Sequence, residues 1–300
     1  MIKRIALIAF VALLLGVGSI GYAQSDPALL AAVTQAFDQT RASASLHIET
    51  QSLVVRDGGR GQQSSSTWDM TAVEAGWNLS GSQTTVLQMG EIQIETTMQY
   101  KVVDGVTYMN LDGVQGMPGG QGTQELPQGW FVLTDDGMNP PMFGQVENLA
   151  NQALGGLEFP ISAESVTAIV ELPGDTLNGQ AMRIYQLSLD AQALLSFGRG
   201  GFGGMPPVGG QNAPPTDGQN MPPGGGQRPD FGQALDPSAI QITFAVYVGQ
   251  DDGLIHRIYS VIETAFSGSD GAQSTTTATV VSDFTVPAQA IEIAAPEVSA

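Results

Sequence analysis

Apolar and polar residues alternate over several long stretches of the chain. In the first stretch, Leu46, Ile48 and Val54 share one side, and polar residues occupy most of the positions between them. The same period of two returns at Ile92–Val102 and at Ile240–Val248. Because successive side chains of a β-strand point to opposite faces, these stretches predict strands with one apolar face. Such strands form antiparallel sheets that are covered on one side only.

Helical periods and turn residues complete this pattern. A capping side chain followed by a proline predicts an amphipathic helix at about Pro27–Arg41. Two further helical stretches are predicted at Gly144–Leu154 and Asp190–Phe197. Pairs such as Asp104-Gly105 and Asn178-Gly179 predict tight hairpins between the strands.

The N-terminal residues have the pattern of an export signal. Lys3 and Arg4 precede the apolar run Ile5–Val17, and small residues follow at the positions that a signal peptidase requires. We therefore expect a signal peptide at residues 1–23, a mature domain at residues 24–300, and a secreted, periplasmic or cell-envelope location. An uncleaved membrane anchor is the alternative, because the uncharged stretch is just long enough to span a bilayer.

Composition narrows the chemistry and the partners. With 29 acidic and 10 basic residues, the net charge is -19. This charge repels phosphate backbones, so nucleic acid is not an expected partner. The chain contains no cysteine, which excludes disulfides, thiolate metal sites, a cysteine nucleophile and a lipid-modified N-terminal cysteine.

A segment rich in glycine and proline, Gly198–Asp236, interrupts the strand pattern. It contains three near-copies of a Pro-Pro element and too few apolar residues to offset the entropy lost on ordering. We expect it to be a disordered insert inside one domain. A linker between two domains is the weaker alternative, because the part of the chain that follows has strands but no helix to cover them.

Several local sequences follow one another in an order that occurs in a known family. They are Ala44–Glu49 after the first helix, Val103–Met109, Gly129–Leu133, Leu177–Tyr185, Val246–Arg257, and Ser282–Phe284 before Pro287, Ile291 and Pro296. Together they resemble the LppX/LprG family of exported lipoproteins, which are relatives of the LolA-type lipoprotein carriers. The chain departs from that family in lacking a lipobox cysteine, and Tyr247 stands where many relatives have tryptophan.

The resemblance implies an α+β fold in which an antiparallel β-sheet curls into a LolA-like half-barrel, with a few helices on the concave side. It also implies a cavity for an apolar ligand such as a lipid or an acyl chain. The candidate lining residues are Ile48, Ile94, Met98, Tyr100, Phe244 and Val246. An ordinary filled core is the alternative for these apolar stripes.

Three classes of function follow from these observations. The first is a monomeric, non-catalytic envelope protein that binds or carries an apolar ligand without a cofactor or metal. The second is a surface interaction or scaffold module with a filled core, working with an envelope partner protein. A hydrolase is the third class and the least favoured, because the sequence contains no Gly-x-Ser-x-Gly elbow or histidine cluster. His47 and His256 occupy polar strand positions and are predicted to be surface residues.

Overall fold

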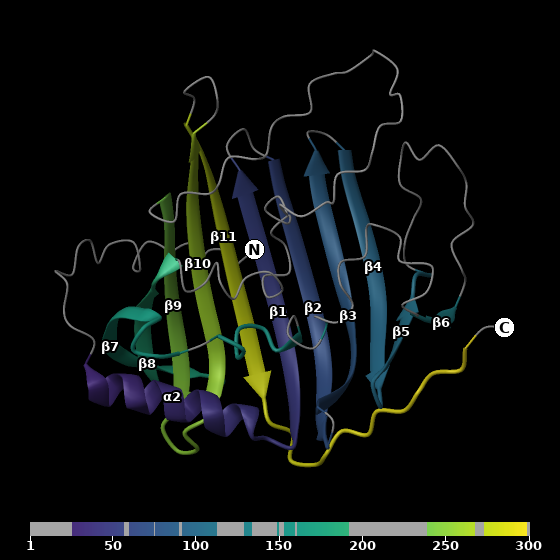
Figure 1. The fold of residues 1–300 in the computed structure, drawn as a ribbon, viewed down its shortest axis with the longest axis horizontal. Coiled ribbons are helices and arrows are strands. Elements are labelled where there is room, and N and C mark those ends of the chain that lie inside the picture. The colour runs from purple at the N-terminus through teal and green to yellow at the C-terminus, as the bar shows by residue number, and fades with distance from the viewer. Residues whose placement is uncertain are drawn as a thin grey trace, which may run out of the picture.

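Eleven strands of the described chain form one antiparallel sheet that does not close into a barrel (Figure 1). The computed structural model describes residues 26–56, 60–74, 76–89, 92–112, 129–133, 149, 153–159, 161–191, 239–267 and 273–298. In order across the sheet, the strands are β6 (Trp130–Val132), β5 (Val106–Asn110), β4 (Ile92–Val103), β3 (Gly76–Met89), β2 (Arg60–Val73), β1 (Ser45–Arg56), β11 (Gln273–Thr285), β10 (Ile255–Ser267), β9 (Ile240–Gly249), β8 (Gln180–Leu189) and β7 (Val166–Leu177). This architecture confirms the predicted α+β fold with an open antiparallel sheet that curls into a half-barrel.

The first and last strands lie side by side in the middle of the sheet (Figure 1). β1 pairs with β11 from His47, opposite Thr285, to Arg56, opposite Thr276. Strands that are adjacent in sequence pair on either side of this seam. The long-range pairing therefore joins the two halves of the chain in one sheet.

Two of the predicted hairpins have the backbone that their sequences require. Asp104 and Gly105 have φ angles of 52° and 80°, and Asn178 and Gly179 have 54° and 85°. Positive φ at both central residues defines the turn type whose twist matches that of the flanking strands. Asn and Asp tolerate this conformation and Gly adopts it freely, so the local sequence determines these turns.

The helix α2 (Pro27–Arg41) lies across one end of the sheet, in front of the strands at the β7 side (Figure 1). It begins after Asp26, whose side chain accepts a hydrogen bond from the Ala28 backbone N–H at 2.8 Å. The buried residues are Val33, Ala36, Phe37 and Thr40, which share one stripe of the helix. Through this stripe the helix contacts β7, β9 and β10.

After β11, the C-terminal residues run away from α2 and cross the ends of the strands from β1 toward β6 (Figure 1). Ile291 binds Ser45 through its N–H at 3.2 Å and Thr71 through its carbonyl at 2.6 Å. Farther along, Lys101 donates to the Ala294 carbonyl at 3.2 Å. Within the described residues the tail reaches β6, where Val298 forms a parallel bridge with Trp130.

Several predicted segments lie outside the described residues. These are the signal peptide at residues 1–23, the insert at 198–236, and most of the helices predicted at 144–154 and 190–197. No helix in the described ranges has the length and apolar character that crossing a membrane requires.

Candidate functional site

The two faces of the sheet differ in what lies on them. Along β1, Ile48 and Thr50 point to one face and His47 points to the other, as the period of two requires. The segment 153–159 lies on the first face. A Cβ added at Gly155 would stand 3.2 Å from Thr50 Oγ1, which shows how closely the segment approaches this face. We call this covered side the inner face and the opposite side the outer face.

The helix α2 is joined to the segment that lies on the inner face. Arg41 Nε donates to the Leu157 carbonyl at 2.7 Å, and a second guanidinium nitrogen donates to the Phe159 carbonyl at 3.1 Å. At the same end of the helix, the Ile255 backbone N–H donates to Thr40 Oγ1 at 2.9 Å. The helix and the segment therefore form one cover that is held to the sheet.

This cover packs the half of the inner face that lies next to α2. The rings of Phe159 and Phe244 meet edge to face, with centroids 4.6 Å apart. Phe244, Val246, Ile48 and Tyr100 are all buried in the same hydrophobic cluster. In this half, four of the six candidate lining residues are part of a packed core.

Farther from α2, the cross-strand rows on the inner face change from apolar to polar. The row through Ile48 is Phe284, Ile48, Trp68, Gly81 and Tyr100. The next two rows are Ser282, Thr50, Ser66, Gln83 and Met98, and then Val280, Ser52, Ser64, Thr85 and Thr96. The row beyond them is Ala278, Val54, Gln62, Leu87 and Ile94. Two rows rich in hydroxyl and amide groups thus lie between two largely apolar rows.

Over β2–β4, the rows farthest from α2 are partly exposed. Leu87 exposes 38% of its surface, and its cross-strand partner Ile94 is half-buried. Met98 is half-buried as well. We define the open patch as Ser66, Gln83, Thr85, Leu87, Ile94, Thr96 and Met98. It combines apolar side chains with uncharged polar ones on one surface.

Hydroxyl groups are paired in the centre of the sheet and unpaired in the open patch. Thr50 and Ser282 share a hydrogen bond of 3.0 Å, and Ser52 and Ser64 share one of 2.6 Å. Within the described ranges, four polar side chains of the open patch make no side-chain hydrogen bond: Ser66, Gln83, Thr85 and Thr96. Their donors and acceptors are available to water or to a ligand.

Ionisable side chains do not occur in the three rows from Ser282 to Ile94, among the strands described there. Glu49, Asp69 and Lys101 of the same strands point to the outer face, whereas Arg56 lies on the inner face in the row beyond Val54. A molecule on the open patch therefore meets an uncharged surface.

Tyr100 stands between the packed half and the open patch. Burial raises the pKa of Tyr100 to about 12, so the phenol keeps its proton at any physiological pH. Its hydroxyl donates to Met98 Sδ at 3.2 Å. This hydrogen bond gives the buried phenol a partner, and the protonated phenol adds no charge to the inner face.

Each of the two histidines contacts a carboxylate, and His47 points to the outer face. His47 Nδ1 is 2.7 Å from Asp69 Oδ1, and Nε2 is 3.5 Å from Glu49 Oε1, so carboxylates contact both ring nitrogens. His256 Nε2 is 2.9 Å from Asp252 Oδ2. The described residues hold no group of three His, Asp or Glu side chains that could bind a metal ion.

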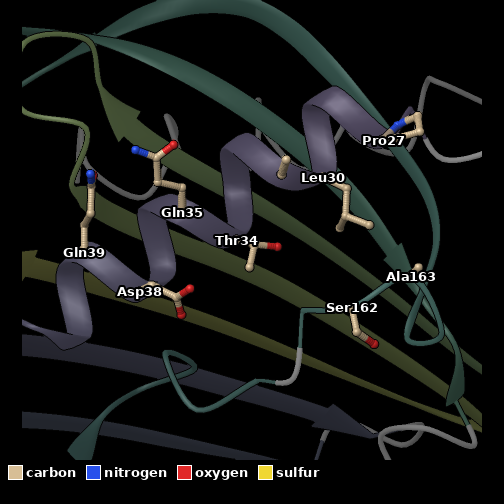
Figure 2. A pocket seen from close by; sticks show the side chains of 9 residues that line it. Pro27, Leu30, Thr34, Gln35, Asp38, Gln39, Ser162 and Ala163 are labelled. Atoms are coloured by element: carbon tan, nitrogen blue, oxygen red, sulfur yellow. The ribbon is translucent and has the colours of Figure 1, made fainter.

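A groove of 560 Å³ lies between α2 and the loop at 162–163 (Figure 2). Its lining consists of Pro27, Leu30, Ala31, Thr34, Gln35, Asp38, Gln39, Ser162 and Ala163. The carboxylate in this lining, Asp38, is 3.2 Å from the Arg41 guanidinium. The groove is wide open to solvent and therefore could enclose little of a small molecule.

Tertiary structure divides the six candidate lining residues into two groups. Ile94 belongs to the open patch, Met98 lies at its edge, half-buried and packed against the core, and the other four belong to the packed half. Sequence reasoning missed the four polar members of the patch, because a Ser, Thr or Gln among apolar positions weakens the periodic signal. Only the cross-strand register aligns them in rows.

Comparison with solved structures gives three informative similarities. The chain is similar to LprF from Mycobacterium bovis, with 12% identity over 90% of this chain and 99% of that one and a TM-score of 0.41. It is similar to the lipoprotein LppX from Mycobacterium tuberculosis, with 13% identity over 89% and 100% and a TM-score of 0.40. A LolA superfamily protein from Nitrosomonas europaea matches with 7% identity over 86% and 91% and a TM-score of 0.23.

The names of these structures include LppX and the LolA superfamily, which the sequence also resembles. No protein-family model and no curated protein sequence matches the chain. With TM-scores below 0.5, these similarities carry no argument about this chain, and any function of the open patch is argued from the residues of this chain alone.

Proposed function

We propose that this protein is an exported, non-catalytic protein that binds an apolar or amphipathic small molecule, such as a lipid or an acyl chain, on the inner face of its half-barrel. The observation that carries the proposal is the open patch itself. Leu87, Ile94 and Met98 remain partly exposed on the inner face, although the other half of that face is packed.

The physical reason is the cost of exposed apolar surface on a concave sheet. Leu87 and Ile94 are cross-strand partners, so their apolar side chains form a continuous surface. Each methylene that a ligand buries there contributes about 0.8 kcal/mol, while association costs several kcal/mol. A single acyl chain would therefore bind reversibly, as a carrier requires.

A charge on the open patch tests the proposal. We expect Ile94→Lys to weaken the binding of a fluorescent diacyl lipid at least about tenfold, because an acyl chain over the ammonium group would strip its water. The measurement is a fluorescence titration of the mature protein. Absence of saturable binding to the unmodified protein would overturn the proposal.

Gln93→Lys is the matched control. Gln93 precedes Ile94 on β4, is exposed and points to the outer face. The same lysine at this position should leave lipid binding unchanged. Equal losses from the two substitutions would attribute the effect to the net charge and not to the inner face.

A scaffold module with a filled core is the second candidate, and one observation favours it. Ile48, Phe244 and Val246 are fully packed, so this half of the inner face offers no room for a ligand. If the module is a scaffold, the open patch binds a partner protein and the lipid titration shows no saturation.

A further inference from the structure

We propose that the open patch selects an uncharged amphiphile, and that the polar group of the ligand lies on the inner face against the hydroxyl groups of β2–β4. This inference rests on the proposed function, because it names the chemical class of ligand for the same surface. It differs from a purely apolar cavity, in which the head group would remain in solvent.

The hydrogen-bonding groups of the patch indicate that the ligand has a polar part. Thr85 and Thr96 are cross-strand partners, and Gln83 is the cross-strand partner of Met98 in the adjacent row. In the described structure these three polar side chains make no side-chain hydrogen bond, whereas Thr50 is paired with Ser282. A hydrocarbon chain over these side chains would displace their water without offering hydrogen bonds in return, which is unfavourable.

The order of the rows indicates that the ligand is an amphiphile. The apolar pair Leu87 and Ile94 follows the hydroxyl pair Thr85 and Thr96 along the same two strands. Alternate residues of a strand are about 6.6 Å apart, so a polar row and an apolar row lie within one small amphiphile. Hydroxyl, ester or amide groups would contact the threonines, and an acyl chain would contact Leu87 and Ile94.

The absence of charged side chains on the patch indicates that the head group of the ligand is neutral. The three inner-face rows from Ser282 to Ile94 contain no ionisable side chain on β11 and β1–β4, so the patch itself offers no cation to a carboxylate or a phosphate. Arg56 follows Val54 on the same face of β1 and lies in the next row, outside the patch. The chain as a whole has a net charge of -19 and repels anions. The patch therefore fits a neutral head group rich in hydrogen-bonding atoms, as in a monoacylglycerol.

Three probes with the same pyrene-labelled chain test the inference: a monoacylglycerol, the fatty acid and the alkane. At about pH 8 the fatty acid is ionised. We expect the unmodified protein to bind the monoacylglycerol roughly tenfold more tightly than the fatty acid. We expect Thr85→Val combined with Thr96→Val to weaken monoacylglycerol binding by roughly tenfold and to leave alkane binding unchanged or tighter.

The outer face supplies a matched control. Thr84 and Thr97 are cross-strand partners on the same two strands, and their hydroxyl groups bind each other at 2.9 Å. Thr84→Val combined with Thr97→Val makes the same chemical change on the opposite face. Valine favours β-strands, so both double variants are expected to fold, and this control should bind all three probes as the unmodified protein does.

The outcomes separate the two proposals. No saturable binding of any probe would overturn both the proposed function and this inference. Equal affinities for the monoacylglycerol and the alkane, with no effect of the inner-face double variant, would overturn the inference and leave lipid binding in place. Tighter binding of the fatty acid would also overturn the inference, because it would show that a cation pairs with the head group of the ligand.

Discussion

His47 shows how single residues set the pH dependence of stability. Partial burial opposes the charged ring, but the hydrogen bonds with Asp69 and Glu49 outweigh it and raise the pKa of His47 above its ordinary value of 6.5. A group with a raised folded pKa stabilises the fold fully below its unfolded pKa and loses that contribution as pH rises through the folded pKa.

We therefore expect the stability advantage of the unmodified protein over a His47→Gln variant to be largest below about pH 6 and to shrink as the solution becomes alkaline. Urea unfolding of both proteins between about pH 5.5 and 8.5 measures this difference. The same pH profile for both proteins, or an advantage that grows toward high pH, would contradict the assignment.

Single glycines matter where strands approach a large ring. A Cβ at Gly81 would overlap the Trp68 side chain, which lies across from it on β2. The indole fills the space that a side chain on β3 would occupy, and this lets Trp68 pack beside Tyr100, with ring centroids 5.9 Å apart. Packing in this half of the inner face therefore depends on the absence of a side chain at Gly81.

At the scale of elements, Arg41 decides whether α2 and the segment 153–159 cover the sheet as one unit. We expect Arg41→Met to lower the free energy of unfolding by about 2 kcal/mol, because it removes two charge-assisted hydrogen bonds to backbone carbonyls. The midpoint of urea unfolding, at an unchanged slope, reports this loss.

Arg183→Met is the comparison for this prediction. Arg183 pairs with Glu171 at 2.9 Å, but 45% and 37% of the two side chains are exposed. Exposed ion pairs contribute little, so the expected loss is below about 1 kcal/mol. If Arg183→Met lowered the free energy of unfolding more than Arg41→Met, the hydrogen bonds of the cover would contribute less to stability than this exposed ion pair does.

At the scale of the whole molecule, the sheet is continuous on both sides of the sequence insert. β8 and β9 are neighbouring antiparallel strands, with Ser188 opposite Thr243. The strand that precedes the insert and the one that follows it therefore lie side by side. A short connection can replace a long one at this place, because the entropy of loop closure depends only weakly on loop length.

We expect deletion of residues 198–236, with a short Gly/Ser link, to change the free energy of unfolding by less than about 1 kcal/mol. Thermal and urea unfolding of the deletion variant measure this change. Loss of cooperative unfolding would show that the insert contributes to the core, and the picture of one domain with a disordered insert would be wrong.

Much of the local structure can be read directly from the sequence. The period of two assigned Ile48, Ile94 and Phe244 to apolar strand faces, and the Asp-Gly and Asn-Gly pairs located the hairpins. The capping residue and proline located the start of α2. These features follow from contacts between residues that are close in the chain, which is why they can be read without a structure.

Which inner positions are packed and which are open depends on contacts between distant parts of the chain. Phe159 packs against Phe244 across 85 residues of chain, and Thr50 meets Ser282 across 232. The register of five strands placed Thr85 and Thr96 in one uncharged row beside Leu87 and Ile94. Such contacts depend on which strands become neighbours, and a single sequence specifies the two faces of each strand but not the strand beside it.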